Sequence, residues 1–288
     1  MIPNNFEYVR AQSVQEALAF LSQYGDDSKL LAGGHSLIPA MKLRLNAPSK
    51  LIDITRIREL NDIRKSDATI QIGALATHRT VESSDVIKNN CTVLAETAGK
   101  IGDPQVRNRG TIGGSLAHAD PAADYPALLL ALDADIEIAA QSGNRTVGAD
   151  KFFTGFFETE LKSDEIITQV RFPVLSKGTG AAYEKFPHPA SRFAVVGVAA
   201  MLTVDSNGIC TTARVGVTGA AESAFRAVDV ENALIGKPLD EKAITNTTAK
   251  VADPANLLSD LIASAEYRAH LCSVLAKRAL MTAMERAK

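Results

Sequence analysis

The chain has 288 residues, 46% of them hydrophobic and 22% charged, and a formal net charge of -2. These values describe an ordinary globular protein with room for one large domain or two modest ones, and they give no sign of a nucleic acid or an anionic membrane as partner. The longest apolar stretches, such as 126–132 and 193–203, are too short to cross a bilayer, and the first residues lack the pattern of a secretory signal.

The first fifty-odd residues predict a compact α/β unit. Residues 13–21 read as a helix, because Ser13 can cap it and the apolar residues after it share one face. Short strands are expected at 29–33 and 50–54, and a helix is expected between them at 37–45.

The middle of the chain mixes predicted strands with predicted helices. We expect strands at 69–73, 135–140 and 166–172, helices at 80–87, 92–101 and 125–132, and a loop at 103–121, which is rich in Gly, Pro, Asp and Asn.

A small, polar stretch with Ser176, Gly178 and Gly180 is typical of a linker between domains. Strands are predicted on either side of Asn207-Gly208, a strong hairpin signal, at 194–204 and 211–219, and the rest of the chain is mostly helical. We therefore predict one domain at 1–176, with subdomains of about 1–56 and 57–176, and a second domain at 177–288.

Three cysteines, Cys91, Cys210 and Cys272, are far apart and form no CxxC pair. An odd number of isolated cysteines is typical of reduced thiols in a cytoplasmic protein. Since an iron–sulfur cluster usually needs four thiolates, we expect no cluster on this chain. We expect a cytoplasmic location, and attachment at the inner face of the membrane stays open.

Two similar glycine loops carry the most informative pattern, and they lie at Ala32–Ser36 and Thr111–Ser115. Glycine permits positive φ and removes the Cβ, so successive backbone N–H groups can face one anion. Two such loops suit two linked phosphates, with hydroxyl groups as additional donors. Neither loop is a GxGxxG or P-loop motif, and both can also be read as ordinary tight turns.

The segments KLLAGGHSLIPAMKLRL at 29–45, DPQVRNRGTIGGSLAHADPAADYPALLLAL at 103–132 and AAYEKF at 181–186 make the chain recognisable. It closely resembles the medium subunits of aerobic carbon monoxide dehydrogenases and, more broadly, the FAD domains of the xanthine dehydrogenase family. The likeness covers essentially the whole chain. It implies an α+β fold, with a two-part FAD-binding domain of the vanillyl-alcohol-oxidase (PCMH) type. A smaller C-terminal α+β domain follows, with a short antiparallel sheet and helices.

The resemblance also implies a function. In this family a large subunit carries molybdopterin and hydroxylates the substrate, and a small subunit carries two [2Fe–2S] clusters. The medium subunit binds FAD noncovalently, takes electrons from the clusters and passes them to an external acceptor, and we expect a dimer of heterotrimers. A self-contained FAD oxidase or dehydrogenase and a noncatalytic nucleotide-binding protein stay open as alternatives.

The site residues follow from the same resemblance, which implies neither a catalytic residue nor a metal ligand on this chain. Asp124 matches a carboxylate near the ribose or phosphate of FAD, Ile101 and Phe193 match residues beside the flavin ring, and Ile167 and Lys185 match positions near its polar edge. The matches to the loops that hold the diphosphate are Ala32, Gly33, Gly34, His35, Ser36, Thr111, Ile112, Gly113, Gly114 and Ser115.

Two departures from the family pattern bear on the function. Ser115 stands where relatives often have Asn, and its hydroxyl can still donate a hydrogen bond. The stretch 186–193, Phe-Pro-His-Pro-Ala-Ser-Arg-Phe, replaces a basic stretch that leads to Gly-Asp and an aromatic residue. This change weakens an assignment to carbon monoxide, and aldehydes or N-heterocycles stay open as substrates.

Several tempting residues have a plain alternative. His35 could attach FAD covalently, although close relatives hold it noncovalently, and packing or hydrogen bonding beside the cofactor is the simpler reading. His118 and Asp120 make only two ligands for a metal, which usually needs more. Arg107 and Arg109 either neutralise phosphate or face solvent or another subunit. The histidines at 78, 188 and 270 suit surface or structural roles.

Overall fold

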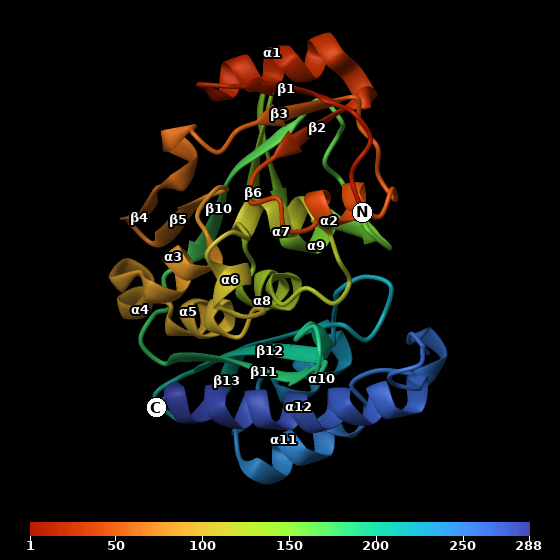
Figure 1. Cartoon of the computed structure of the whole chain (residues 1–288). Helices are drawn as coiled ribbons and strands as arrows, with labels where there is room; N and C mark the ends of the chain where they lie inside the picture. Colours follow the sequence, from red (N-terminus) through yellow and green to blue (C-terminus); the bar gives the residue numbers. More distant parts are fainter.

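The computed structural model describes residues 1–249 and 251–288. Three groups of elements follow one another along the molecule (Figure 1). An N-terminal unit lies at one end, a sheet with a cluster of short helices lies in the middle, and a second sheet with a long helix lies at the other end.

The N-terminal unit is built on a three-stranded parallel sheet of order β1-β3-β2. Its elements are β1 (Glu7–Arg10), α1 (Val14–Tyr24), β2 (Ser28–Leu31), α2 (Leu37–Lys42) and β3 (Lys50–Asp53). Helix α1 begins where the Ser13 side chain accepts a hydrogen bond from the Glu16 N–H, and it buries the apolar face that the spacing predicted. The predicted α/β unit is confirmed.

The middle of the molecule contains a five-stranded antiparallel sheet of order β4-β5-β10-β6-β7. Its strands are β4 (Ile63–Ser66), β5 (Thr69–Gly73), β6 (Asp135–Ala140), β7 (Gly143–Gly148) and β10 (Ile166–Pro173). The predictions for β5, β6 and β10 are confirmed. Strands β4 and β7 went unpredicted because they are short, polar and mostly exposed, so they carry little apolar alternation.

A cluster of short helices packs on this sheet, with a small hairpin beside it. It comprises α3 (His78–Ser83), α4 (Asp85–Asn90), α5 (Thr92–Gly99), α6 (Pro104–Arg107), α7 (Ile112–His118), α8 (Tyr125–Leu132) and α9 (Ala149–Phe152), and the hairpin is β8 (Phe153–Gly155) with β9 (Glu158–Thr159). The predicted helix at 80–87 is divided because Ser84 caps a new helix.

The prediction of a continuous loop at 103–121 is wrong, since α6 and α7 lie within it. Each of these helices begins at a side-chain cap, because Asp103 accepts from the Val106 N–H and Thr111 accepts from the Gly114 N–H. Local caps and tertiary packing here outweigh the low helix propensity of the glycines.

The C-terminal part has an antiparallel sheet of order β11-β12-β13-β14. Its elements are β11 (Thr179–Pro187), β12 (Ala194–Val204), β13 (Cys210–Thr218), β14 (Phe225–Arg226), α10 (Val228–Leu234), α11 (Glu241–Thr247) and α12 (Ala265–Arg286). Part of the predicted linker is therefore strand, because β11 begins at Thr179. The hairpin at Asn207-Gly208 is confirmed, and Gly208 has φ +76°.

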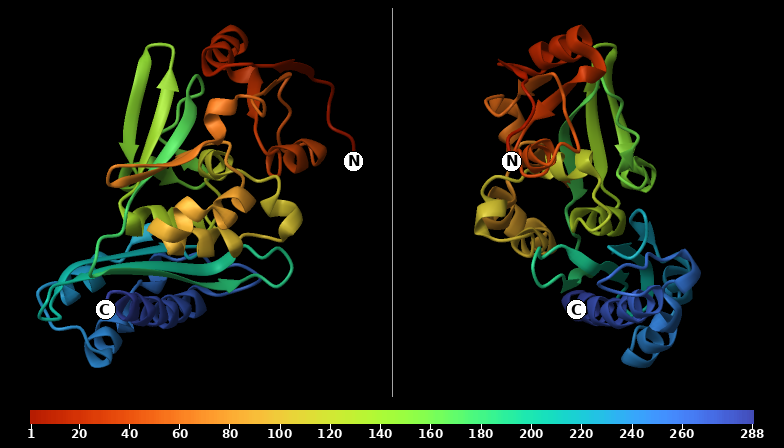
Figure 2. Two further views of the ribbon diagram at one scale, coloured as in Figure 1. Left: turned by 90° about the vertical axis from the view of Figure 1, so that its left-hand side faces the viewer. Right: turned by 45° about the vertical axis from the view of Figure 1, so that its right-hand side comes forward.

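Helices cover both faces of this sheet, as the two turned views show (Figure 2). Helix α8 packs on one face and α12 on the other. Alternate residues of β11 follow this arrangement, since Ala181 and Tyr183 join the core around α8, whereas Ala182 joins the core under α12. None of the helices in the described ranges combines the length and apolar composition that crossing a bilayer requires.

Candidate functional site: a cleft between the two glycine loops

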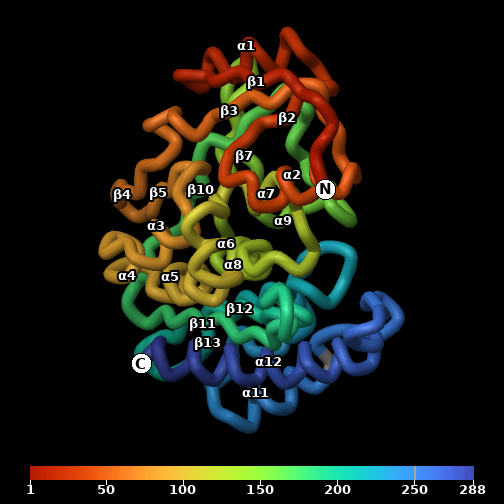
Figure 3. The backbone as a smooth tube through the Cα atoms, in the orientation of Figure 1, coloured from red at the N-terminus to blue at the C-terminus, as the bar shows by residue number. Residues whose placement is uncertain are grey.

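A cleft of about 590 Å³ is lined by residues of the N-terminal unit and of the central helices. Helices α2, α6 and α7, which contribute to its wall, are labelled in Figure 3. This volume is within the usual range for small-molecule and cofactor sites. All but two of the predicted site residues line it. They are Ala32, Gly33, Gly34, His35, Ser36, Ile101, Thr111, Gly113, Gly114, Ser115, Asp124, Ile167 and Phe193.

The glycines let the cleft walls approach closely. A Cβ added at Gly33 would lie 2.1 Å from the carbonyl oxygen of Arg109, at the start of the second loop. A Cβ added at Gly113 would lie 2.5 Å from the Cβ of Ala74, at the end of β5. Only glycine fits at these two contacts, so backbone packing brings the two loops together.

The first loop presents unpaired backbone donors. The N–H groups of Gly33, Gly34, His35 and Ser36 donate to no acceptor in the described part of the chain. Gly34 has φ +77°, a conformation that glycine adopts at little cost. Four successive free N–H groups on a cleft wall can bind an anion.

The second loop differs from our expectation that both loops offer free N–H groups. The N–H of Gly113 donates to the Ala74 carbonyl at 2.9 Å, that of Gly114 to Thr111 Oγ1 at 3.1 Å, and that of Ser115 to the Thr111 carbonyl at 3.0 Å. The expectation is therefore wrong for this loop. It can still offer the hydroxyls of Thr111 and Ser115 as donors.

Ile112 does not line the cleft. Its side chain is fully buried in the core, and its N–H donates to the Ala76 carbonyl at 3.0 Å. Its apolar side chain anchors the second loop from behind.

A buried ion pair lies behind the cleft wall. Lys185 Nζ is 2.8 Å from Asp124 Oδ1, and the Tyr183 hydroxyl donates to the same carboxylate at 2.6 Å. The Asp124 and Lys185 side chains are each 4% exposed. Burial raises the pKa of Asp124, and the Lys185 ammonium and the Tyr183 hydroxyl oppose that rise.

Lys185 lies behind the cleft wall, and its predicted position near the flavin ring stays a prediction. Its ammonium does not line the cleft, because it is held by Asp124 and by the Lys100 carbonyl at 3.1 Å. Asp124 does line the cleft, so the Lys185 ammonium acts on the cleft by balancing the charge of this carboxylate.

Lys100 and Gly197 complete this network and went unpredicted. Lys100 Nζ donates to the Tyr183 carbonyl and lies 5.5 Å from the centroid of the Tyr183 ring. A Cβ at Gly197 would lie 2.3 Å from the Tyr183 hydroxyl oxygen, so glycine leaves the space that this hydroxyl needs. No local pattern signals these roles, because the partners are far apart in sequence.

The turn between β11 and β12 contributes Ser191, Arg192 and Phe193 to the cleft wall and contains most of the stretch that departs from the family pattern. His188 Nδ1 accepts hydrogen bonds from the N–H groups of Ala190 and Ser191, and the His188 N–H donates to the Phe193 carbonyl at 2.8 Å. These bonds fix the turn, so the expected structural role of His188 is confirmed. Phe193 is 44% exposed at the mouth.

Charged or titratable side chains outside the predicted set also line the cleft, among them Glu165 and His78. Glu165 accepts two hydrogen bonds from Arg145, at 2.8 and 2.7 Å, which together with the Lys162 N–H lower its pKa. The surroundings of His78 lower its pKa to about 4, mainly through burial. Its imidazole is therefore neutral near pH 7.

The other tempting residues have ordinary contacts. Arg107 binds Glu82 at 3.1 Å and the Ile101 carbonyl at 3.1 Å, so it holds the loop before α6. His118 lies on the cleft wall with its ring 5.1 Å from that of Phe157. In the described ranges, no three His, Cys, Asp or Glu side chains are grouped as metal ligands.

Comparison with known proteins gives the family. Residues 4–175 match the model described as the FAD binding domain in molybdopterin dehydrogenase, and residues 181–283 match the CO dehydrogenase flavoprotein C-terminal domain. The chain belongs to the FAD-binding medium subunits of the molybdenum hydroxylases.

Relatives agree over almost the whole chain. The carbon monoxide dehydrogenase medium chain of Hydrogenophaga pseudoflava is 41% identical, over 99% of both chains. The alpha subunit of the 6-hydroxypseudooxynicotine dehydrogenase complex of Paenarthrobacter nicotinovorans is 40% identical, over 100% of this chain and 97% of its own. A solved structure of carbon monoxide dehydrogenase from H. pseudoflava superposes with a TM-score of 0.95 at 43% identity, over 99% of both chains.

The cleft of this medium subunit suits FAD chemically. The free N–H groups of the first loop suit the two phosphates, which need donors. Ile101 and Ile167 give apolar wall, and Phe193 gives an aromatic face, as a flat ring system needs.

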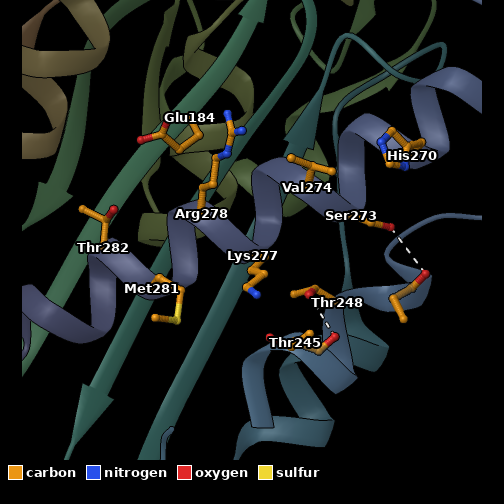
Figure 4. A pocket seen from close by; sticks show the side chains of 11 residues that line it. Glu184, Thr245, Thr248, His270, Ser273, Val274, Lys277, Arg278, Met281 and Thr282 are labelled. Atoms are coloured by element: carbon orange, nitrogen blue, oxygen red, sulfur yellow. Dashed lines mark hydrogen bonds between the residues drawn. The ribbon is translucent and has the colours of Figure 1, made fainter. Parts of the chain in front are cut away.

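A second hollow, of about 720 Å³, lies on the far side of the C-terminal sheet between α12 and α11 (Figure 4). Lys277 and Arg278 of α12 border it, but Lys277 is paired with Glu241 at 3.3 Å. Hydroxyls on its wall are also occupied, since Thr248 donates to the Ile244 carbonyl at 2.9 Å. None of the predicted site residues lines this hollow.

Proposed function

We propose that this medium subunit binds one FAD noncovalently in the cleft and transfers electrons through it. The observation that carries the proposal is the row of four unpaired N–H groups in the first glycine loop, on the wall of a cleft of suitable volume. FAD supplies the redox chemistry when it is bound, and the protein positions it and controls access.

Most of the predicted residues have a direct role in this proposal. Residues 32–36 hold the diphosphate, and the hydroxyls of Thr111 and Ser115 add donors. Ile101, Ile167 and Phe193 pack against the ring, with Phe193 reducing water access at the mouth. Asp124 faces the ribose or phosphate region, and Lys185 compensates its charge from behind.

The proposal includes partners on other chains. A small subunit with two [2Fe–2S] clusters donates electrons, a large molybdopterin subunit hydroxylates the substrate, and an external acceptor receives the electrons, in a dimer of heterotrimers. The names of the relatives support an assembly, because one is a subunit of a complex and the other a medium chain. These two relatives are 40% and 41% identical and are named for different substrates, so similarity leaves the substrate class open.

Flavin content tests the binding site. The purified complex should contain one FAD per copy of this chain, and acid precipitation should release the yellow chromophore into the supernatant. Flavin that stays with the protein pellet would contradict noncovalent binding and indicate attachment at His35.

Anaerobic mixing tests the role in electron transfer. The isolated chain loaded with FAD should show no bleaching of its flavin band by an aldehyde, a purine or carbon monoxide. Bleaching by the correct substrate should appear only when both other subunits are added. Rapid bleaching of the isolated chain would refute the subunit role and favour a self-contained flavoenzyme.

A further inference from the structure

His78 occupies an unusual place for a histidine without an assigned role. It is the first residue of α3, lines the cleft and is only 4% exposed. Its N–H donates to the Gly110 carbonyl at 2.9 Å. A Cβ at Gly110 would lie 2.6 Å from His78 Nε2, so the imidazole edge packs directly over the backbone that leads into the second glycine loop.

The hydrogen bonding of the ring indicates its tautomer. Nδ1 is 3.3 Å from the hydroxyl of Tyr125, a fully buried phenol with no other acceptor among the described residues, so we assign the phenol as the donor. Nδ1 is then the acceptor. Because burial keeps the imidazole neutral, its single proton is on Nε2.

The Nε2–H group has no acceptor among the described residues. Nε2 is also accessible to solvent. Among the described residues, the one side-chain nitrogen or oxygen that is both unpaired and closed off from solvent is Arg268 Nε. A side chain that is nine-tenths buried on the cleft wall thus keeps a donor without a partner among the described residues.

The position of this donor indicates which part of a ligand it meets. A Cβ at Gly33 would lie 3.1 Å from the Cα of Gly110, so the first loop contacts the same residue on which the imidazole packs. The free N–H groups of residues 33–36 and the His78 donor therefore belong to the same corner of the cleft.

We propose that His78 is a ligand-binding residue whose neutral Nε2–H donates a hydrogen bond to a phosphate oxygen of the bound dinucleotide. This inference rests on the proposed function and adds a residue and a contact to it. A neutral donor suits this corner because a buried cation would cost more to desolvate before the ligand arrives.

The test compares two polar variants of different reach. His78→Gln places an amide N–H close to the position of Nε2, whereas the shorter His78→Asn does not. The full chain is stripped of flavin, and its affinity is measured for FAD, for ADP and for riboflavin, which lacks phosphate. His78→Phe fills the space without a donor, and His270→Phe, on the exposed side of α12, serves as a distant control.

His78→Asn and His78→Phe should weaken FAD and ADP binding about 10- to 100-fold, the usual effect of losing a hydrogen bond to a charged group. Riboflavin binding should be unchanged, and His78→Gln should stay within about threefold of wild type, since it retains the donor. If His78→Phe fails to fold, the comparison of Asn with Gln still decides.

Equal FAD affinity in His78→Asn and wild type would overturn the inference and leave the proposed function intact. An equal loss for riboflavin and FAD would place the contact at the ring and overturn the phosphate assignment. A wild-type chain that binds neither FAD nor ADP would instead refute the proposed function itself.

Discussion

The buried pair of Lys185 and Asp124 makes the sharpest stability prediction. Lys185→Met keeps the unbranched stem but removes the ammonium, so the Asp124 carboxylate stays buried with only the Tyr183 hydroxyl as partner. Both side chains are 4% exposed, so solvent screening weakens the interaction little. Breaking such a pair by removing one partner typically costs about 3–5 kcal/mol, because an uncompensated charge is left behind.

Denaturant unfolding measures this loss, and a second substitution tests its cause. The variant Asp124→Asn with Lys185→Met should recover more than half of the lost stability, since no unpaired charge then remains. The loss in Lys185→Met should also shrink at acidic pH. Without the cation the pKa of Asp124 rises further, and a raised pKa gives stability that is present at low pH and lost as the pH rises through it.

The matched control is Lys277→Met, which breaks an ion pair with 37% and 69% exposed side chains. It should cost less than about 1 kcal/mol, as exposed pairs usually do. A loss below about 1 kcal/mol for Lys185→Met, or additive losses in the double variant, would refute the reasoning that Asp124 depends on this ammonium.

Three further predictions follow from the cleft. Gly33→Ala should lower flavin content strongly in a chain that still melts cooperatively, since its Cβ would meet the Arg109 carbonyl at 2.1 Å. Gly236→Ala, which has open space but a φ of +79°, should lower stability and keep its flavin. The pKa of His78 falls from 6.5 to about 4 on folding, so the free energy of unfolding of wild type should fall by on the order of 3 kcal/mol between about pH 6.5 and pH 4. His78→Gln should not show this loss, and parallel pH profiles of the unfolding free energy in the two proteins would contradict the prediction. His188→Ala should cost about 1–2 kcal/mol and weaken FAD binding, because two turn N–H groups lose their acceptor; unchanged melting would show that the turn is fixed by other contacts.

Local patterns predicted much of this fold. The capped helix after Ser13 and the buried strand at 194–204 have the apolar spacing of their elements, so the sequence alone located them. The two glycine pairs likewise indicated where the backbone comes close to another group. Short elements such as α7 depend on a side-chain cap and on contact with Ala74. A contact between residues about forty positions apart produces no periodic pattern of apolar residues, so the sequence did not predict this helix.

The roles of individual atoms were less accessible than the identity of the residues. Both glycine loops have the same pattern, yet only the first keeps its N–H groups free. In the second loop these N–H groups donate to Thr111 and to the carbonyls of the residues that follow β5. A free donor is defined by what the rest of the chain does not supply, which only the folded arrangement reveals.

The network behind Asp124 shows that the C-terminal part of the chain belongs to the cleft. Asp124 and Lys185 are 61 residues apart, and the lysine comes from β11, beyond the predicted domain boundary near 177. A Cβ at Gly216 would lie 2.1 Å from the Ala127 carbonyl, so α8 packs almost backbone to backbone on the C-terminal sheet. Residues 1–176 alone would keep the glycine loops but leave Asp124 without its ammonium and α8 with an uncovered apolar face. The C-terminal sheet therefore supports the cleft directly, because it supplies both the charge and the packing that hold Asp124 in its wall.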